Sequence, residues 1–201
     1  MPPLTPAPKP GQRIGLLGGS FNPAHDGHVH ISALALRRLK LDQLWWLVSP
    51  QNPLKPESGM ASLPERIKGA KKIAAADPRI IVTDLETQLE TRHTVDTVKA
   101  LKRRYPEVSF VWVMGADLLV QVPHWKNWRS LFRTVPIAVF ARPAYSSRAL
   151  TGKAARRFRA FRVARFRVGA LADLRPPAWA FLRTRLNPQS ATRIRAGKRQ
   201  G

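Results

Sequence analysis

The stretch that decides the fold is 14–28, which reads Ile-Gly-Leu-Leu-Gly-Gly-Ser-Phe-Asn-Pro-Ala-His-Asp-Gly-His. Its apolar start, 14–18, predicts a short buried strand, and the glycine pair at its end predicts a turn. Apolar residues then recur at helical spacing over 29–41, with basic residues near the end, which predicts a helix. This strand, turn and helix begin an alternation that continues along the chain.

The rest of the chain repeats the alternation of strands and helices. Further strands are predicted at 45–48, 80–82, 110–114, 137–140 and 179–186, further helices at 64–76 and 94–105, and a proline-rich loop at 49–56. Continuously apolar strands separated by helices indicate a parallel sheet covered on both faces. The predicted fold class is therefore α/β, a doubly wound, Rossmann-like parallel sheet. We expect a flexible, proline-rich N-terminus over 1–12 and a single domain over 13–201.

Composition excludes several classes of protein. No cysteine is present among the 201 residues, which rules out disulfides and thiolate catalysis. Hydrophobic residues make up 44% of the chain, which excludes wholesale disorder, yet no apolar run reaches the roughly 20 residues that cross a bilayer. The proline-rich start lacks the apolar stretch of a secretory signal. We therefore expect a cytoplasmic protein with no membrane partner.

The charge is strongly positive and unevenly distributed. Lys and Arg number 35 against 12 acidic residues, and 148–201 carries 15 of these cations with Asp173 as its only acid. Such an excess suggests an anionic partner, either a nucleic acid or a phosphorylated small molecule. The alternative is that the arginines are merely solvated. Arg is mixed with Phe and Val over 156–168, and this pattern does not discriminate between helix and strand.

The residues after the first strand carry the chemistry, because ligands of doubly wound sheets bind beyond the carboxyl ends of the strands. Gly18 and Gly19 allow the backbone to approach a ligand closely. His25 and His28 follow at the mouth of the predicted helix, where imidazoles and helix N–H groups together suit a developing negative charge on phosphate. The alternatives are two incidental histidines in a turn, or half of a metal site. Neither GxGxxG nor GxxxxGK[ST] is present.

Several motifs, taken together, resemble one family. Residues 18–28 resemble the signature G-G-[ST]-F-[DN]-P-x-H-x-G-H of the HxGH nucleotidyltransferases. The stretches that resemble the bacterial nicotinate-nucleotide adenylyltransferases in particular are 49–55, 92–98, 114–117 with 122–128, and Arg142-Pro143. Residues 190–195 resemble the family segment that binds the ATP phosphates, with Gln189 and Ala191 in place of the usual isoleucine and second serine.

The resemblance implies adenylyl transfer from ATP to nicotinate mononucleotide, with His25 and His28 as catalytic residues. The ATP-binding residues that it implies are Gly18, Gly19, Ser20, Phe21, His28, Asp117, Ser190, Thr192 and Arg195. The mononucleotide-binding residues that it implies are Ser20, Lys55, Thr94 and Trp125. Mg²⁺ would be held by ATP phosphates and water, with no protein side chain as ligand. ATP and nicotinate mononucleotide are the expected partners, with no specific nucleic acid.

Some of these residues have a second interpretation from the sequence alone. Trp125 is a candidate stacking platform for the pyridine ring, or else a core tryptophan. Asp117 is a candidate acceptor for ribose hydroxyls, or else the N-cap of a helix. The C-terminal match could be only a basic end to the chain. Two rival functions stay open: another HxGH enzyme, using nicotinamide mononucleotide or phosphopantetheine, and a basic nucleic-acid-binding module, for which 156–168 would supply arginines and aromatics.

Overall fold

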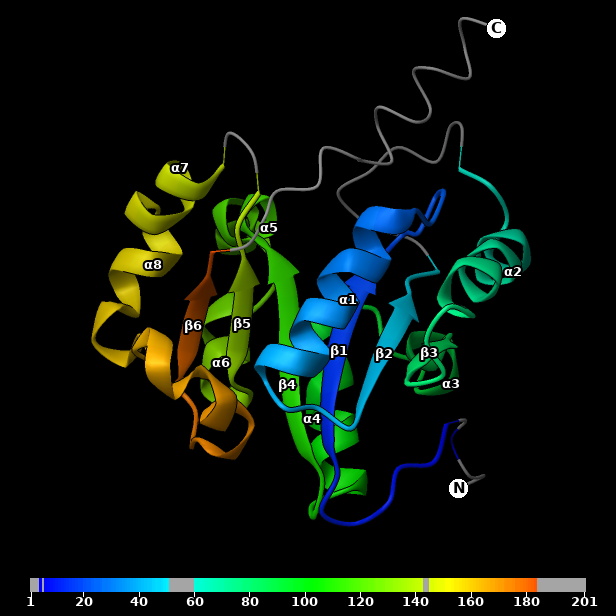
Figure 1. Ribbon diagram of the computed structural model, residues 1–201, viewed down its shortest axis with the longest axis horizontal. Helices are drawn as coiled ribbons and strands as arrows, with labels where there is room; N and C mark the ends of the chain where they lie inside the picture. The colour runs from blue at the N-terminus through cyan, green and yellow to red at the C-terminus, as the bar shows by residue number, and fades with distance from the viewer. Residues whose placement is uncertain (1–3, 5, 51–59, 143–144, 184–201) are drawn as a thin grey trace, which may run out of the picture.

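The computed structural model describes residues 4, 6–50, 60–142 and 145–183, and its centre is a six-stranded parallel sheet (Figure 1). The strands are β1 (Arg13–Gly19), β2 (Gln43–Val48), β3 (Ile80–Thr83), β4 (Ser109–Gly115), β5 (Ile137–Phe140) and β6 (Trp179–Leu182). Their order is β3-β2-β1-β4-β5-β6. The chain therefore winds outward from β1 in both directions, and the order reverses between β1 and β4, where doubly wound sheets bind ligands. The predicted fold class is confirmed.

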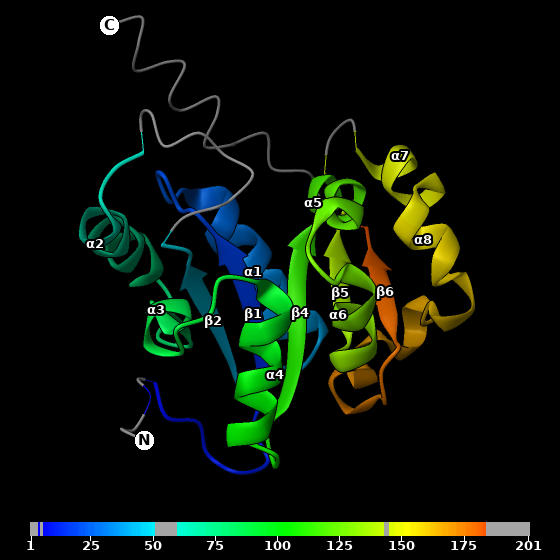
Figure 2. The ribbon, with the colours of Figure 1, turned by 180° about the vertical axis from the view of Figure 1, so that it is seen from behind.

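Helices cover both faces of the sheet (Figures 1 and 2). One face packs against α1 (Asp26–Arg38), α2 (Leu63–Ala74) and the 3-10 segment η3 (Arg165–Asp173). The other apolar cluster joins the sheet to α3 (Leu85–Gln88), α4 (Thr94–Arg104), α5 (Ala116–Gln121), α6 (Trp128–Thr134), α7 (Ser146–Thr151) and α8 (Lys153–Arg157). The short 3-10 turns η1 (Val122–His124) and η2 (Arg159–Phe161) complete the described elements.

Strand geometry explains why the sheet has two cores. Successive side chains of a strand point to opposite faces, so an uninterrupted apolar run places apolar side chains in both cores. In β2, Trp45 joins the cluster that contains α4 and α5, whereas Trp46 joins the cluster that contains α1 and α2. Both rings are fully buried. Burial of a large apolar side chain contributes about 1.5–3 kcal/mol, so these central strands anchor both layers.

Two predicted boundaries need correction. The helix predicted at 29–41 begins at Asp26 and ends at Arg38, because His25 caps its first turn and Leu39 its last. Lys40 then adopts a left-handed backbone (φ 53°), which a continuing helix does not allow. The strand predicted at 179–186 runs over Trp179–Leu182, and its last three positions lie outside the described residues.

The sequence pattern missed the short helices α3 and α5 to α8, because apolar periodicity cannot be recognised over one or two turns. The undecided region 156–168 is neither one helix nor one strand. It holds the end of α8, all of η2, a single bridge from Arg162 to Trp179 and the start of η3.

The flexibility expected of 1–12 stays a prediction. In the described part of that segment, Leu4 is buried in the core, and the Gly11 N–H donates to the Glu107 carbonyl at 2.9 Å. Among the described residues, none of the helices combines the length and the apolar character that crossing a bilayer requires.

Candidate active site

The turn from β1 into α1 places two histidines at the start of a helix. His25 is the N-cap residue of α1, and its Nδ1 accepts a hydrogen bond from the Gly27 N–H at 3.1 Å. The His25 N–H in turn donates to Nδ1 of His28 at 3.2 Å. Both rings thus use Nδ1 as an acceptor, so in a neutral imidazole the proton sits on Nε2. The capping box therefore leaves both histidines as Nε2–H donors.

Aromatic packing fixes the two imidazoles. Their ring centroids lie 3.9 Å apart, and the ring of Phe21 lies 4.8 Å from that of His28 and 4.9 Å from that of Trp46. The Trp46 indole N–H donates to Ser32 Oγ at 2.8 Å, and this hydroxyl donates to the His28 carbonyl at 2.7 Å. The His28 ring therefore packs on Phe21, which packs on Trp46, and the hydrogen bond to Ser32 holds the Trp46 indole in place.

The environment keeps His25 neutral. Burial lowers the pKa of His25 below its ordinary value of 6.5, the positive charge of Arg142 lowers it further, and Asp26 acts in the opposite direction. His25 is only 5% exposed. At neutral pH it is consequently a preorganised, uncharged donor rather than an imidazolium.

The glycines at the end of β1 make room for neighbouring rings. A Cβ at Gly18 would lie 2.6 Å from the Trp112 ring, and one at Gly19 would lie 3.3 Å from Phe21. Packing alone therefore requires a glycine at 18, quite apart from any ligand. The close approach of ATP to this backbone stays a prediction.

An ion pair lies across the ends of β4 and β5. Arg142 Nε lies 3.3 Å from Asp117 Oδ1, and neither atom has a hydrogen-bond partner in the described part of the chain. A Cβ at Gly115 would collide with both side chains, so this glycine creates the space for the pair. The alternative role of Asp117 as a helix N-cap is wrong. The N-cap of α5 is Gly115, and Asp117 lies in the first turn.

Arg66 is a buried positioning residue that the sequence did not single out. It is 3% exposed, and its guanidinium donates to four backbone carbonyls: Ala61, Ser20, Ser49 and Pro50, at 2.7 to 2.9 Å. These carbonyls follow β1, follow β2 and precede α2, so one side chain ties three segments together at the carboxyl end of the sheet. In the sequence Arg66 is one of several cations on an amphipathic helix, and no local signal marks it.

Trp125 and Thr94 both belong to the layer on the α4 and α5 side of the sheet. Trp125 is half-buried, and its ring meets that of Trp112 edge to face, with centroids 6.5 Å apart at 88°. Trp112 in turn packs beneath Gly18, which connects Trp125 to the end of β1. Trp125 thus contacts the core and stays partly accessible. Thr94 is half-buried in the first turn of α4.

The structure brings together His25, His28, Phe21 and the glycine turn, with Arg142 and Asp117 across the next strand ends. Figure 1 shows the β1–α1 turn, α5 and the start of α2 at the end of the sheet to which the arrows point. Other predicted site residues lie outside the described residues, namely Lys55, Ser190, Thr192 and Arg195. No group of three or more metal-ligating side chains occurs among the residues described.

Comparison with known proteins extends these observations. A family model described as "Cytidylyltransferase-like" matches residues 16–197. A protein of Parvibaculum lavamentivorans, "Probable nicotinate-nucleotide adenylyltransferase", is 52% identical over 92% of this chain and 92% of its own length. A protein of Caulobacter sp. with the same name is 46% identical over 94% of this chain and all of its own length.

A solved structure has the same fold. The nicotinic acid mononucleotide adenylyltransferase of Plasmodium falciparum, complexed with NaAD, superposes with a TM-score of 0.70 over 92% of this chain and 83% of that one, at 16% identity. On the strength of the family model and the bacterial relatives, the chain belongs to the cytidylyltransferase-like family and, within it, to the nicotinate-nucleotide adenylyltransferases.

Proposed function

We propose that this chain transfers the adenylyl group of ATP to nicotinate mononucleotide, giving nicotinate adenine dinucleotide and pyrophosphate. The observation that carries the proposal is the capping box of His25 and His28, which turns two imidazoles into Nε2–H donors at a helix N-terminus. The name shared by the bacterial relatives supports this choice of substrates.

The reaction needs alignment and charge stabilisation rather than a protein nucleophile. An oxygen of the mononucleotide phosphate attacks the α-phosphorus of ATP and forms the new P–O bond. The bond from that phosphorus to the bridging oxygen breaks, and pyrophosphate leaves with the electron pair. Negative charge on the transferred phosphoryl oxygens would be met by Nε2–H of His25 and His28, because rigid donors in a partly buried site stabilise such charge without reorganising.

Arg142 adds a positive charge to the same site. Its field already lowers the pKa of His25, so it would also attract a phosphate bound there. Asp117, held beside Arg142, would use its remaining carboxylate oxygen to accept from a ribose hydroxyl of ATP. Arg66 would touch neither substrate. It would keep the ends of β1 and β2 in place around them.

The mononucleotide would bind on the α4 side of the sheet. Trp125 offers its accessible ring face for stacking on the electron-poor pyridine, with Thr94 as a hydrogen-bonding neighbour. Ser20 and Phe21 would follow the reacting phosphates with Gly18 and Gly19. Roles for Lys55, Ser190, Thr192 and Arg195 stay predictions from the sequence.

Mg²⁺ is the proposed cofactor, carried by ATP. Its preferred ligands are oxygens, whereas His25 and His28 offer nitrogens and the Asp117 carboxylate is paired with Arg142. This donor set fits an ion held by the ATP phosphates and water, with no protein side chain as ligand. When bound, the ion neutralises phosphate charge. A cytoplasmic location likewise stays a prediction.

Pyrophosphate release tests the proposal. The full chain is incubated with ATP, Mg²⁺ and, in separate reactions, nicotinate mononucleotide, nicotinamide mononucleotide or phosphopantetheine, and the nucleotide product is identified by mass spectrometry. We expect the highest kcat/KM with nicotinate mononucleotide. Faster turnover of either other acceptor would replace the proposed substrate, and no release with any of them would refute adenylyl transfer.

A further inference from the structure

A basic pocket lies at the amino end of the sheet, away from the histidines. Five cationic side chains line this cavity of about 570 Å³: Arg13, Arg38, Lys40, Arg165 and Arg167. They come from the start of β1, the end of α1 with the turn that follows it, and η3, so the fold brings together charges that are far apart in the sequence. Asp173 is the only carboxylate in the lining, and it pairs with Arg13 at 2.9 Å. Four cations of the pocket thus have no ion pair with any described residue.

An exposed aromatic ring accompanies these charges. Phe166 is 87% exposed, between Arg165 and Arg167, and it also lines the pocket. Because this ring lies outside the core and beside the cations of the pocket, a ligand bound to those cations would contact it. Phe161, on the neighbouring η2 turn, is also exposed, at 45%. Two exposed phenylalanines therefore lie in this arginine-rich stretch of the chain.

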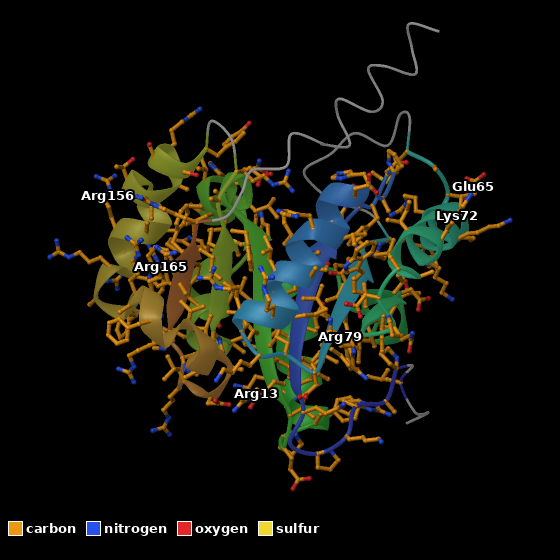
Figure 3. All side chains as sticks on the ribbon, in the orientation of Figure 1. Arg13, Glu65, Lys72, Arg79, Arg156 and Arg165 are labelled. Carbon is orange, nitrogen blue, oxygen red and sulfur yellow. The ribbon has the colours of Figure 1, made fainter. Side chains whose placement is uncertain are left out.

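The surroundings of the pocket are basic as well. Among described residues from 145 to 183, Asp173 is the only acid, whereas the exposed cations include Arg156, Arg159 and Arg162. Figure 3 shows Arg156 and Arg165 on the same side of the molecule, away from α2 and Lys72.

The basic pocket and the histidine pair are separate sites. His25 caps the start of α1, whereas Arg38 is its last residue. A helix of 13 residues is about 20 Å long. The substrates of the adenylyl transfer cannot account for both groups of side chains at once.

We propose that the basic pocket binds single-stranded nucleic acid without sequence preference, with the arginines and Lys40 on phosphates and Phe166 stacked on a base. Flexible cations beside an exposed aromatic ring are the combination that such strands require. Inorganic phosphate would leave Phe166 without a role, and a duplex would offer it no accessible base face. An anionic membrane would need several apolar side chains to insert, and Phe166 is the one exposed aromatic ring among the described residues that line this pocket.

Fluorescence anisotropy tests this proposal with a labelled oligouridine of about 12 nucleotides, a length within the range of single-strand sites, at about 150 mM salt. Inorganic polyphosphate serves as the competitor without bases. We expect Phe166→Ala to weaken oligouridine binding by about 5- to 150-fold, the loss of one stacked base, and to leave polyphosphate competition unchanged. Arg165→Ala/Arg167→Ala should weaken both and reduce the slope of log Kd against log salt by about 1.4.

The matched control is Lys71→Ala/Lys72→Ala, which removes the same charge from the exposed face of α2. Retained binding in the control, with intact adenylyl transfer in every variant, supports the proposal. An equal loss in the control, or equal effects of Phe166→Ala on oligouridine and polyphosphate, would mean that binding depends only on positive charge in general. Either result would overturn the proposal. Binding to phosphatidylserine vesicles is the remaining measurement. If it is stronger than binding to oligouridine and is lost in Phe166→Ala, the ligand is an anionic membrane and the nucleic-acid proposal is wrong.

Discussion

At the carboxyl end of the sheet, Arg66 and His25 are buried and held by hydrogen bonds, whereas most side chains of the basic pocket at the amino end are exposed. At the carboxyl end, Arg66 is 3% exposed and makes four hydrogen bonds, and His25 is 5% exposed with its Nδ1 occupied. At the amino end, Phe166 is 87% exposed, and the side chains of the Arg13–Asp173 pair are 36% and 44% exposed. Each end holds arginines, so the presence of cations alone does not distinguish them.

Preorganisation is what differs. Catalysis requires donors that are in place before the charge develops, and side chains held by hydrogen bonds meet this requirement. Long, solvated side chains adapt to their ligand instead, which suits a flexible polyanion and lowers affinity through the entropy lost on binding. Substitutions at the carboxyl end should therefore affect rate and stability, and substitutions at the amino end should affect only binding of polyanions.

The largest expected effect is on the histidine donors. His28→Ala should lower kcat by about 10²–10³-fold, the range for removing one preorganised donor, with a smaller change in the KM for ATP. Steady-state pyrophosphate release measures both constants. His124→Ala, which removes an exposed histidine outside the site, is the control and should retain full activity. If both variants retained full activity, His28 would have no part in the reaction.

Arg66 comes next. Arg66→Met should lower the free energy of unfolding by about 3 kcal/mol, as expected for hydrogen bonds to a charged donor, and should lower kcat/KM because the strand ends separate. Arg66→Lys should recover part of both. Urea unfolding and turnover below the midpoint measure the two effects. In the control Arg79→Met, loss of an exposed ion pair with Asp77 should cost less than about 1 kcal/mol. Equal losses of unfolding free energy in Arg66→Met and Arg79→Met would mean that Arg66 does not hold the strand ends in place.

A smaller effect is expected at Trp125. Trp125→Ala should raise the KM for the mononucleotide by an amount equivalent to about 1–3 kcal/mol of lost stacking, with little change in the KM for ATP. Trp125→Phe retains a ring against Trp112 and should recover most of the affinity. Parallel increases of both KM values in a folded Trp125→Ala variant would favour the core-tryptophan interpretation.

The smallest effect is that of pH on stability. Because the pKa of folded His25 lies below 6.5, the unfolded chain binds more protons in the window between the two values. The contribution of His25 to the free energy of unfolding is fully present above pH 6.5 and is lost as the pH falls through the folded pKa of His25. Glu86 acts with the opposite sign, since burial raises its pKa, so total stability does not isolate His25.

The variant His25→Asn isolates this contribution, because asparagine also caps helices but does not titrate. We expect the difference in unfolding free energy between wild type and His25→Asn to shrink or change sign as pH decreases below 6.5. Urea unfolding over a pH series measures it. A difference independent of pH would mean that His25 titrates alike in the folded and unfolded chain.

Much of the carboxyl end was predictable, because its signals are local. The first apolar strand, the glycine turn and the histidine spacing lie within one short stretch. The boundary errors of α1 arose because its first turn, capped by His25, is not apolar, and because the backbone leaves the helix at Leu39 and Lys40 before the apolar pattern ends. Long-range contacts left no such signal. Arg66 and the Arg142–Asp117 pair act across different elements. The basic pocket joins Arg13, Arg38 and Arg165, and only the assembled fold brings them together.

The most direct test of this contrast is to measure pyrophosphate release from ATP and nicotinate mononucleotide by two double variants in one assay. His25→Asn/His28→Gln retains residue types that form a capping box but removes both imidazoles, and Arg165→Ala/Arg167→Ala removes charge from the amino end. We predict that the first loses at least about 10²-fold in kcat while the second matches the wild type. Equal activity in the two folded variants, or a loss confined to the arginine variant, would contradict the assignment of adenylyl transfer to the carboxyl end of the sheet.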